Sequence, residues 1–315
     1  MAVICDVDTR LWASPHQLGP VLEAVVRRLA GERLTMLDGN EESHFAHSRG
    51  VDRTFVLGFR SKALGADLSN EFIAAAVRRR PDRLVGFAGI DPLLPSWRDD
   101  LTRAIDLGLV GVSVSPSFQG FPPTHSQAMR LWERCMANGL PVIVSRPAPM
   151  PAAAVLEWDR PTHWDEVLRA LPTLTVVFAG LGMPYVEETL VLLAKHERTF
   201  AHIAGCMRRP VDAYRWIAAV IELGVASRLL FASGFPQESP TAVMERLYGL
   251  NALMHGAGHG IGQPTGLAPI ARRELLAIIE RDAMSCLGLR DRAAIVDQGE
   301  QAALLAAAQS LLIDH

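Results

Sequence analysis

Short apolar runs alternate with segments of helical period along most of this sequence, and this alternation limits the folds open to the chain. Eight runs have the length and residue content of buried strands: Val3–Asp8, Thr54–Phe59, Leu84–Ile90, Val110–Ser115, Pro141–Ser145, Leu174–Ala179, Thr199–Ile203 and Leu229–Ser233. Helix-period segments lie between and after them, such as Asn70–Arg80, Trp97–Leu107, Ser126–Asn138, Trp164–Leu171, Tyr185–Lys195, Val211–Leu223 and Thr241–Leu253. Eight strand–helix units in this order are typical of a (β/α)8 TIM barrel, an α/β fold.

Local residues support these boundaries. Gly108 and Gly139 lie where two of the helices would end, and glycine is favoured just past a helix C-terminus. Ser239 and Pro240 suit the N-cap and the first position of the helix that follows the eighth strand. Periodicity and capping residues therefore favour the same barrel.

The remaining segments add connections and two further helical patterns. The two patterns are Ala271–Leu287 and Ala293–Leu312. The long connections Thr9–Arg53 and Met254–Ala268 are places where lids or interfaces could form. The sequence shows no dividing linker and no internal repeat. We expect one domain over residues 1–315, with the barrel in about 1–255 and extra C-terminal helices in about 271–312.

Composition narrows the class of protein and its partners. The chain has 315 residues, of which 49% are hydrophobic and 21% charged, with a formal net charge of −3. No run of Lys and Arg is dense enough for a nucleic-acid footprint, and no apolar run reaches the ~18 residues of a membrane span. Without a secretory signal, the chain is expected to be cytoplasmic. The four cysteines have no CxxC spacing, so free buried thiols are expected.

The first strand carries charges where an apolar core should continue. Strict alternation would place Asp6, Asp8 and Arg10 on one face with Ile4, opposite Cys5, Val7 and Thr9. Charges on the inner face of a strand are costly unless they are paired or take part in chemistry. In this fold chemistry lies at the C-terminal ends of the strands, which is where Asp8 and Arg10 fall.

Five ordered blocks of sequence resemble a known family. They are PDRLVGFAGIDP (Pro81–Pro92), GLVGVSVSPSFQGF (Gly108–Phe121), LPVIVSRP (Leu140–Pro147), LTVVFAGLGMPYVEE (Leu174–Glu188) and RLLFASGFP (Arg228–Pro236). Their order and spacing resemble the amidohydrolase-related family that includes aminocarboxymuconate-semialdehyde decarboxylase and the resorcylate-type decarboxylases. The similarity extends from the first strand to about Leu289. It implies a TIM barrel and a dimer or larger oligomer.

The resemblance also implies where a metal would be held, and the matching positions differ. Enzymes of this family typically hold zinc or another divalent ion by a His-x-His or acidic-x-His pair after strand 1, histidines after strands 5 and 6, and an aspartate after strand 8. These positions fall on Asp8 with Arg10, Ser145, Gly180 and Gly234. Of the five residues, Asp8 alone retains a side chain suited to a cation.

Ligand chemistry agrees with this difference. A catalytic zinc site usually needs about three N, O or S ligands. Glycine supplies no ligand, serine is a poor neutral one, and the guanidinium of Arg10 has no lone pair and repels a cation. We therefore expect no metal and no other cofactor.

The Asp8–Arg10 pair has two readings. As a charge plug, Arg10 supplies the counter-charge that Asp8 would otherwise take from a metal, and the pair fills the former site. As an anion-binding pocket, Arg10 together with Arg146 would hold a carboxylate or phosphate. Both readings stay open from the sequence.

Several histidines are further candidates. His202, near the end of the seventh strand, could act as a general base or simply be hydrogen-bonded. The pairs His44 with His47 and His255 with His259 have spacings that would suit a metal on a helix, but we expect features of flexible loops there and not a relocated metal site. Neither Ser145 nor Ser233 lies in a GxSxG elbow, so no nucleophile is indicated.

The leading hypothesis is a metal-free, catalytically degenerate member of the resembled family. Such a protein would act as an interaction or regulatory subunit, as a homo-oligomer or beside an active paralogue, with no nucleic-acid or membrane partner.

The rival hypothesis is a metal-independent hydrolase, lyase or decarboxylase for a small carboxylated or aromatic substrate. Arg10 and Arg146 would hold the anion, Asp8 or His202 would move protons, and Ser145 would orient the substrate. A third reading is a divalent ion held by unexpected residues, which elemental analysis would reveal.

Overall fold

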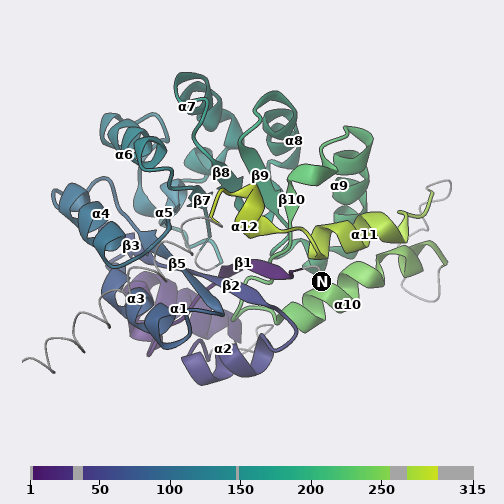
Figure 1. Ribbon diagram of the computed structural model, residues 1–315, viewed down its shortest axis with the longest axis horizontal. Coiled ribbons are helices and arrows are strands. Elements are labelled where there is room, and N and C mark those ends of the chain that lie inside the picture. The colour runs from purple at the N-terminus through teal and green to yellow at the C-terminus, as the bar shows by residue number, and fades with distance from the viewer. Residues whose placement is uncertain (1–2, 31–37, 147–148, 256–267, 290–315) are drawn as a thin grey trace, which may run out of the picture.

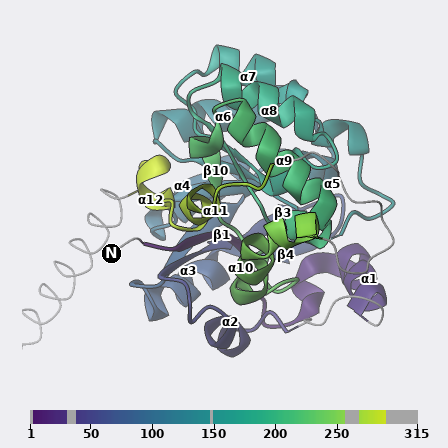
Figure 2. The same cartoon turned by 90° about the vertical axis from the view of Figure 1, so that its right-hand side faces the viewer.

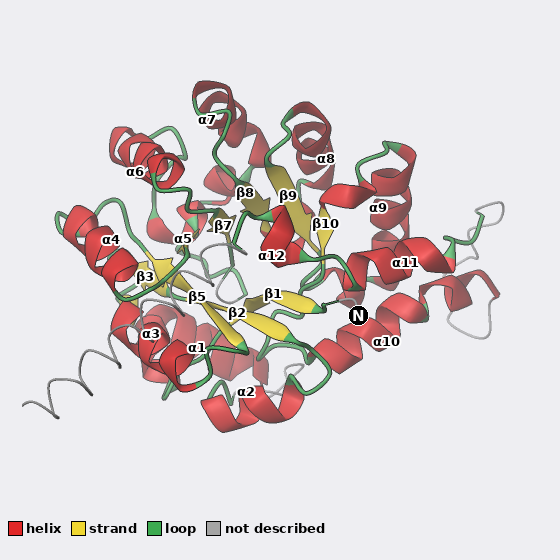
Figure 3. Cartoon of the chain, viewed as in Figure 1, coloured by secondary structure: helices red, strands yellow, loops and turns green. Residues whose placement is uncertain are grey.

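Eight parallel strands form a closed barrel, which confirms the predicted TIM-barrel fold. The computed structural model describes residues 3–30, 38–146, 149–255 and 268–289. The strands follow one another around the barrel in chain order (Figures 1 and 3): β1 (Cys5–Thr9), β2 (Arg53–Leu57), β5 (Leu84–Gly89), β6 (Gly111–Val114), β7 (Val142–Val144), β8 (Val176–Phe178), β9 (Thr199–His202) and β10 (Leu229–Leu230).

Backbone hydrogen bonds between the first and last strand regions close the barrel. The Val7 amide donates to the Phe231 carbonyl at 3.1 Å, and the Gly234 amide donates to the Asp8 carbonyl at 2.9 Å. The Arg10 amide donates to the Phe235 carbonyl at 3.0 Å. These bonds bring the charged residues of β1 beside the residues that follow β10.

Most of the helices surround the barrel on the outside, whereas the last described helix lies across one of its ends (Figure 1). In chain order they are α1 (Gly19–Ala30), α2 (Glu41–His47), α3 (Asn70–Arg79), α4 (Trp97–Asp106), α5 (Pro116–Gln119), α6 (Ser126–Ala137), α7 (Trp164–Ala170), α8 (Val186–Lys195), α9 (Pro210–Glu222), α10 (Pro240–Tyr248), α11 (Arg272–Ile279) and α12 (Ala283–Cys286). The predicted caps are confirmed: the Ser239 hydroxyl accepts from the Ala242 amide, and Gly108 and Gly139 adopt positive φ angles.

Several predicted elements are shorter than expected, and in two places another element follows directly. The second strand ends at Leu57, and the chain then forms an antiparallel hairpin of β3 (Phe59–Ser61) and β4 (Ala66–Leu68). Gly58 lies between β2 and β3, where the backbone packs so closely that an added Cβ would lie 2.6 Å from the Gly89 nitrogen. The helix expected over Thr241–Leu253 ends at Tyr248 and continues as a 3-10 helix, η7 (Leu250–His255).

The predicted C-terminal helix Ala271–Leu287 is two helices, α11 and α12. Asp282 breaks it, because its carboxylate accepts from the Ser285 amide at 3.0 Å and caps a new helix. The second predicted helix, Ala293–Leu312, lies outside the described residues, as does most of the loop Met254–Ala268.

The interior of the barrel is apolar at the N-terminal ends of its strands. Cys5 and Val7 of β1 pack there with inward residues of the other strands and with Ala283, Met284 and Leu287 of the α12 region. Figures 1 and 2 show α12 beside the start of β1, at the end of the barrel opposite the β3–β4 hairpin. This short helix therefore closes one end of the barrel and leaves the other end for a site.

No helix in the described part of the chain is both long and apolar enough to cross a bilayer. The free-thiol prediction agrees with the four cysteines, which form no disulfide: three are buried and Cys286 is partly buried. Cytoplasmic location remains a prediction.

Candidate functional site

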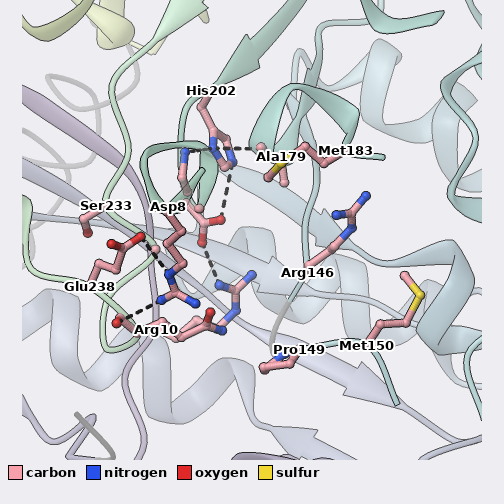
Figure 4. Close-up of a pocket in the computed structure, with 16 residues that line it drawn as sticks. Asp8, Arg10, Arg146, Pro149, Met150, Ala179, Met183, His202, Ser233 and Glu238 are labelled. Atoms are coloured by element: carbon pink, nitrogen blue, oxygen red, sulfur yellow. Dashed lines mark hydrogen bonds and ion pairs between the residues drawn. The ribbon is translucent and has the colours of Figure 1, made fainter. Parts of the chain in front are cut away.

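A cavity of ≈ 250 Å³ opens at the C-terminal ends of the strands. Asp8 reaches it from β1, Arg10 from the position just after β1, Arg146 from the segment after β7, and His202 from the end of β9 (Figure 4). The structure thus brings together four of the five residues that the sequence proposed for catalysis or ligand binding. Ser145, the fifth, is not among the residues that line the cavity.

The first strand does not alternate strictly, which corrects the prediction for its faces. The pairing of β1 with β2 shifts between Asp6 and Thr9, as in a β-bulge. Val7 therefore packs in the barrel interior although the next residue, Asp8, lines the cavity. Asp6 lies outside the cavity lining, so the three charges do not share one face.

The Asp8 carboxylate lies between a cation and a neutral ring. Its Oδ1 accepts from Arg10 Nη1 at 2.7 Å, and its Oδ2 lies 3.3 Å from His202 Nε2. Asp8 is 3% and Arg10 2% exposed. The contact with His202 falls short of hydrogen-bond geometry, and the Arg10 contact is the stronger of the two.

His202 is held in one tautomer by backbone amides. Its Nδ1 lies 3.4 Å from the Gly180 amide nitrogen and 3.3 Å from the Ala204 amide nitrogen, and both amides donate to it. We therefore assign the ring hydrogen to Nε2, which faces Asp8. Complete burial lowers the pKa of His202 to about 4, against the opposing effect of the Asp8 charge. The ring is neutral near pH 7.

Arg10 keeps one edge of its guanidinium without a partner. Among the residues that the structure describes, no group accepts a hydrogen bond from its buried Nε or Nη2. Arg146 differs, because its Nε donates to Asp159 at 2.8 Å and Asp159 also accepts from the Ser117 hydroxyl. The charge-plug reading explains the Asp8–Arg10 pair but leaves these two donors of Arg10 unexplained.

A second ion cluster lies at the rim of the cavity. Arg208 Nε lies 3.0 Å from Glu238 Oε2, and Arg208 Nη2 donates to the Gln237 carbonyl at 3.0 Å. Arg246 forms a further ion pair with Glu238. The sequence did not predict Arg208, Glu238 and Asp159, because they lie in short 3-10 helices and a loop that have no recognisable pattern, and only the fold brings them to the site.

Asp6 is buried behind the cavity and is tied to the last strand region. The Ser233 hydroxyl donates to its Oδ2 at 2.5 Å, and the Ser233 amide donates to its Oδ1 at 2.9 Å. Burial raises the pKa of Asp6 to about 7, and the Ser233 hydrogen bonds oppose this shift. Ser233 thus fixes a buried carboxyl, which gives it a structural role.

The residues at the expected metal positions do not fit a divalent ion. The Ser145 hydroxyl lies 2.9 Å from that of Ser113, so it is engaged inside the barrel wall. Gly180 has φ +55, and an added Cβ would lie 2.9 Å from the Ala204 carbonyl oxygen. Gly234 has φ +75 and also lacks a side chain. Within the described ranges, no three His, Cys, Asp or Glu residues are placed to hold a metal.

The pair of His44 and His47 does not join this site. His44, in α2, has its Nε2 3.2 Å from the Thr9 hydroxyl, and burial lowers its pKa to about 4. His47 Nδ1 lies 2.7 Å from the Ser43 carbonyl oxygen. His255 ends η7, and His259 lies outside the described residues. The first pair is therefore engaged by groups on and beside its own helix.

Comparison with known proteins places the fold and the family. The amidohydrolase family profile matches residues 46–257 of this chain. No functionally curated protein matches the sequence.

Solved structures share the whole barrel at low sequence identity. An uncharacterized TIM-barrel protein from Bordetella bronchiseptica is 19% identical, with a TM-score of 0.67, over 92% of this chain and 99% of that chain. A dihydroxybenzoic acid decarboxylase from Polaromonas sp., with bound manganese and the inhibitor 2-nitroresorcinol, is 15% identical, with a TM-score of 0.63, over 92% and 98%. The 2,6-dihydroxybenzoate decarboxylase from Rhizobium is 16% identical, with a TM-score of 0.63, over 92% and 99%. These similarities show the fold.

Proposed function

We propose a function for this chain from the premise that it belongs to the amidohydrolase family. The chain is a metal-independent member of this family that has lost hydrolytic chemistry and serves as an interaction or regulatory subunit. One observation carries the proposal: Arg10 Nη1 lies 2.7 Å from Asp8 Oδ1. Asp8 is the last ionisable carboxylate at the expected metal positions, and a fixed cation engages it.

Energetics support a permanent replacement of the metal. A divalent ion beside Asp8 would lie next to the positive guanidinium of Arg10, and two like charges in a buried site repel strongly. Gly180 and Gly234 cannot offset this repulsion, since neither supplies a ligand atom. The pocket is therefore better suited to a ligand that accepts hydrogen bonds from Arg10 than to a cation.

Elemental analysis tests the proposal that the protein is metal-independent. The protein would be produced with added manganese and zinc, desalted, and measured by inductively coupled plasma mass spectrometry. We expect metal far below one ion per chain. One equivalent of a divalent metal that survives desalting, and whose removal lowers the melting temperature, would overturn this part of the proposal.

Copurification tests the subunit role. A tagged copy of the chain in its native host should retain a stoichiometric partner, which we expect to be a paralogous barrel with an intact metal site. Isolation of the chain alone or only with copies of itself, in every extract, would argue against a regulatory subunit of a paired enzyme.

A metal-independent lyase or decarboxylase is the second candidate function. It is favoured by the Asp8–His202 contact of 3.3 Å, since the neutral ring and the carboxylate could exchange a proton with a bound carboxylate substrate. Turnover of hydroxybenzoates in excess chelator, lost in both Asp8→Asn and His202→Gln, would support this candidate. Absence of turnover in the wild-type protein, with binding intact, would exclude it for these substrates.

A further inference from the structure

We infer that a small oxyanion binds in the cavity on the free Nε/Nη2 edge of Arg10. This inference rests on the proposed function, because a divalent ion held at Asp8 would occupy the same region. It assigns a recognition chemistry to the cavity: two parallel N–H donors that receive two oxygen atoms of one carboxylate or phosphoryl group.

The shape of the guanidinium supports this assignment. Arg10 uses Nη1 for Asp8, and the two donors left over, Nε and Nη2, lie together on one edge of the planar group. Such an edge matches the spacing of the oxygens in a carboxylate or phosphate and forms two parallel hydrogen bonds. The two free donors of Arg10 therefore have the spacing that one carboxylate or phosphoryl group requires.

Burial makes an empty edge unfavourable. Arg10 is 2% exposed, so bulk water does not reach its side chain freely. Charged donors left unpaired in a buried site are costly, and native structures seldom leave them so. Arg10 lines a cavity of ≈ 250 Å³, which is room for roughly eight waters or for a small organic ion.

The charges around the cavity favour an anion. The charged lining residues and their ion partners include Arg10, Arg146, Arg208 and Arg246, against Asp8, Asp159 and Glu238. Four positive and three negative side chains leave one net positive charge. His202 adds none near neutral pH, because its burial keeps the ring uncharged.

Among the arginines that line the cavity, Arg10 is set apart by its free Nε. Arg146 and Arg208 both direct their Nε atoms to carboxylates, Asp159 and Glu238. Their Nε/Nη2 edges are therefore already engaged in part. Among these three residues, Arg10 alone offers a buried Nε/Nη2 edge on which neither donor is engaged.

The apolar residues of the lining suggest what else the ligand carries besides its oxyanion. Pro149, Met150, Met183 and Ala204 also line the cavity and are apolar. Methionine side chains adapt to flat apolar groups and contact aromatic rings favourably. A carboxylate with a compact apolar body would use both parts of the lining, whereas inorganic phosphate would use only the arginine edge.

Isothermal titration calorimetry on the full chain tests the inference. Benzoate, acetate and inorganic phosphate would be titrated separately in low-salt buffer that contains no other oxyanion. The variants are Arg10→Lys, which keeps the charge beside Asp8 but cannot present the paired donors, and Asp8→Asn/Arg10→Gln, which removes both charges together. Arg169→Gln, which removes an exposed arginine paired with Asp165, is the matched control.

We expect one anion per chain, with binding weakened roughly 10- to 100-fold in Arg10→Lys and unchanged in Arg169→Gln. The double variant should fold, as its melting curve would show, and should lose binding. Stronger binding of benzoate than of acetate and phosphate would identify a carboxylate with an apolar body. Stronger binding of phosphate would identify a phosphoryl ligand on the same edge.

Two results would overturn the inference: no heat of binding with any of the three anions, or equal affinity in Arg10→Lys and the wild-type protein. Metal analysis of the same samples separates the two proposals. A metal-free protein that binds no anion contradicts this inference and leaves the proposed function standing. A metal-loaded protein whose anion binding disappears with chelator contradicts the proposed function as well.

Discussion

The two ends of the barrel interior differ in what their side chains do. At the N-terminal end, Met284 and Leu287 pack against Cys5 and Val7, and this contact surface is apolar. At the C-terminal end, Asp8 and Arg10 lie in a cavity, and Arg10 has two unpaired donors. Burial of apolar side chains at the first end stabilises the folded state, whereas burial of charged side chains at the second end costs desolvation free energy.

Neighbouring residues of one strand therefore serve the stability of the fold at one end and the candidate site at the other. β1 contributes Val7 to the packed end and Asp8 to the cavity, and the bulge between Asp6 and Thr9 lets adjacent residues serve both ends. Buried charge that is retained without a gain in packing is a signature of a site. Mutations at the two ends should therefore separate loss of folding from loss of binding.

Arg10→Ala should give the largest loss of stability at the cavity end. Removing one member of a buried ion pair leaves Asp8 uncompensated, which costs about 3–5 kcal/mol of unfolding free energy. Chemical denaturation would measure this loss. Asp8→Asn/Arg10→Gln should recover most of it, because no charge is then left alone. A double variant as unstable as Arg10→Ala would mean that the pair itself, and not the orphaned charge, stabilises the fold.

Leu287→Ala tests the packed end. Leu287 is 2% exposed in the cluster around α12, so truncation should cost about 2–5 kcal/mol of unfolding free energy. Anion affinity at the other end should stay unchanged. Leu223→Ala is the control, since Leu223 is 54% exposed and its truncation should change stability by less than about 0.5 kcal/mol. Loss of anion binding in folded Leu287→Ala would show that the two ends are coupled.

His44, which lies beside β1, should destabilise the folded protein at low pH. Burial lowers its pKa from 6.5 to about 4, so the unfolded chain takes up a proton first as the pH falls. The contribution of His44 to the free energy of unfolding should therefore decline by roughly 3 kcal/mol as the pH falls from 6.5 towards 4. The contribution of His202 declines in the same direction, whereas that of Asp6, whose pKa is raised to about 7, increases over this interval.

Denaturation of His44→Gln at pH 7 and at pH 4.5 checks this contribution. The variant should lose less stability than the wild-type protein over that interval, and exposed His16→Gln should behave as the wild-type protein does. Equal acid loss in His44→Gln and the wild-type protein would show that His44 does not control this decline.

Gly180→Ala should have the smallest of these effects on stability, and it tests how closely the cavity wall is packed. Both Gly180 and Gly224 have positive φ, which costs alanine about 1–3 kcal/mol. An added Cβ at Gly180 would lie 2.9 Å from a carbonyl oxygen, whereas nothing lies within 4 Å at Gly224. Thermal unfolding should therefore show a larger loss for Gly180→Ala than for Gly224→Ala. Equal losses would mean that the wall near Ala204 yields easily.

The sequence predicted the barrel and most of the candidate site, for a common physical reason. Parallel strands end at one side of the sheet, so Asp8, Arg10, Arg146 and His202 could be placed together without knowledge of their contacts. Ser145 was expected with them. It lies outside the cavity lining because its hydroxyl is paired with Ser113 in the barrel wall.

Other features depend on contacts that no local pattern encodes. The bulge in β1 arises from pairing with β2 and with the segment after β10, so it could not be read from strict alternation. Asp159 reaches Arg146 from a 3-10 helix in a loop, and Asp282 breaks a helix whose periodicity is continuous. Tertiary contacts, and not propensity, decide these positions.

An anomalous difference map tests most directly whether the cavity has exchanged a metal for an ion pair. Crystals would be grown with excess manganese and diffraction recorded with X-rays at which manganese scatters anomalously. We expect no peak within coordination distance of the Asp8 carboxylate, with Arg10 Nη1 remaining on Oδ1. A peak between Asp8 and His202, with Arg10 turned away, would contradict a metal-independent site.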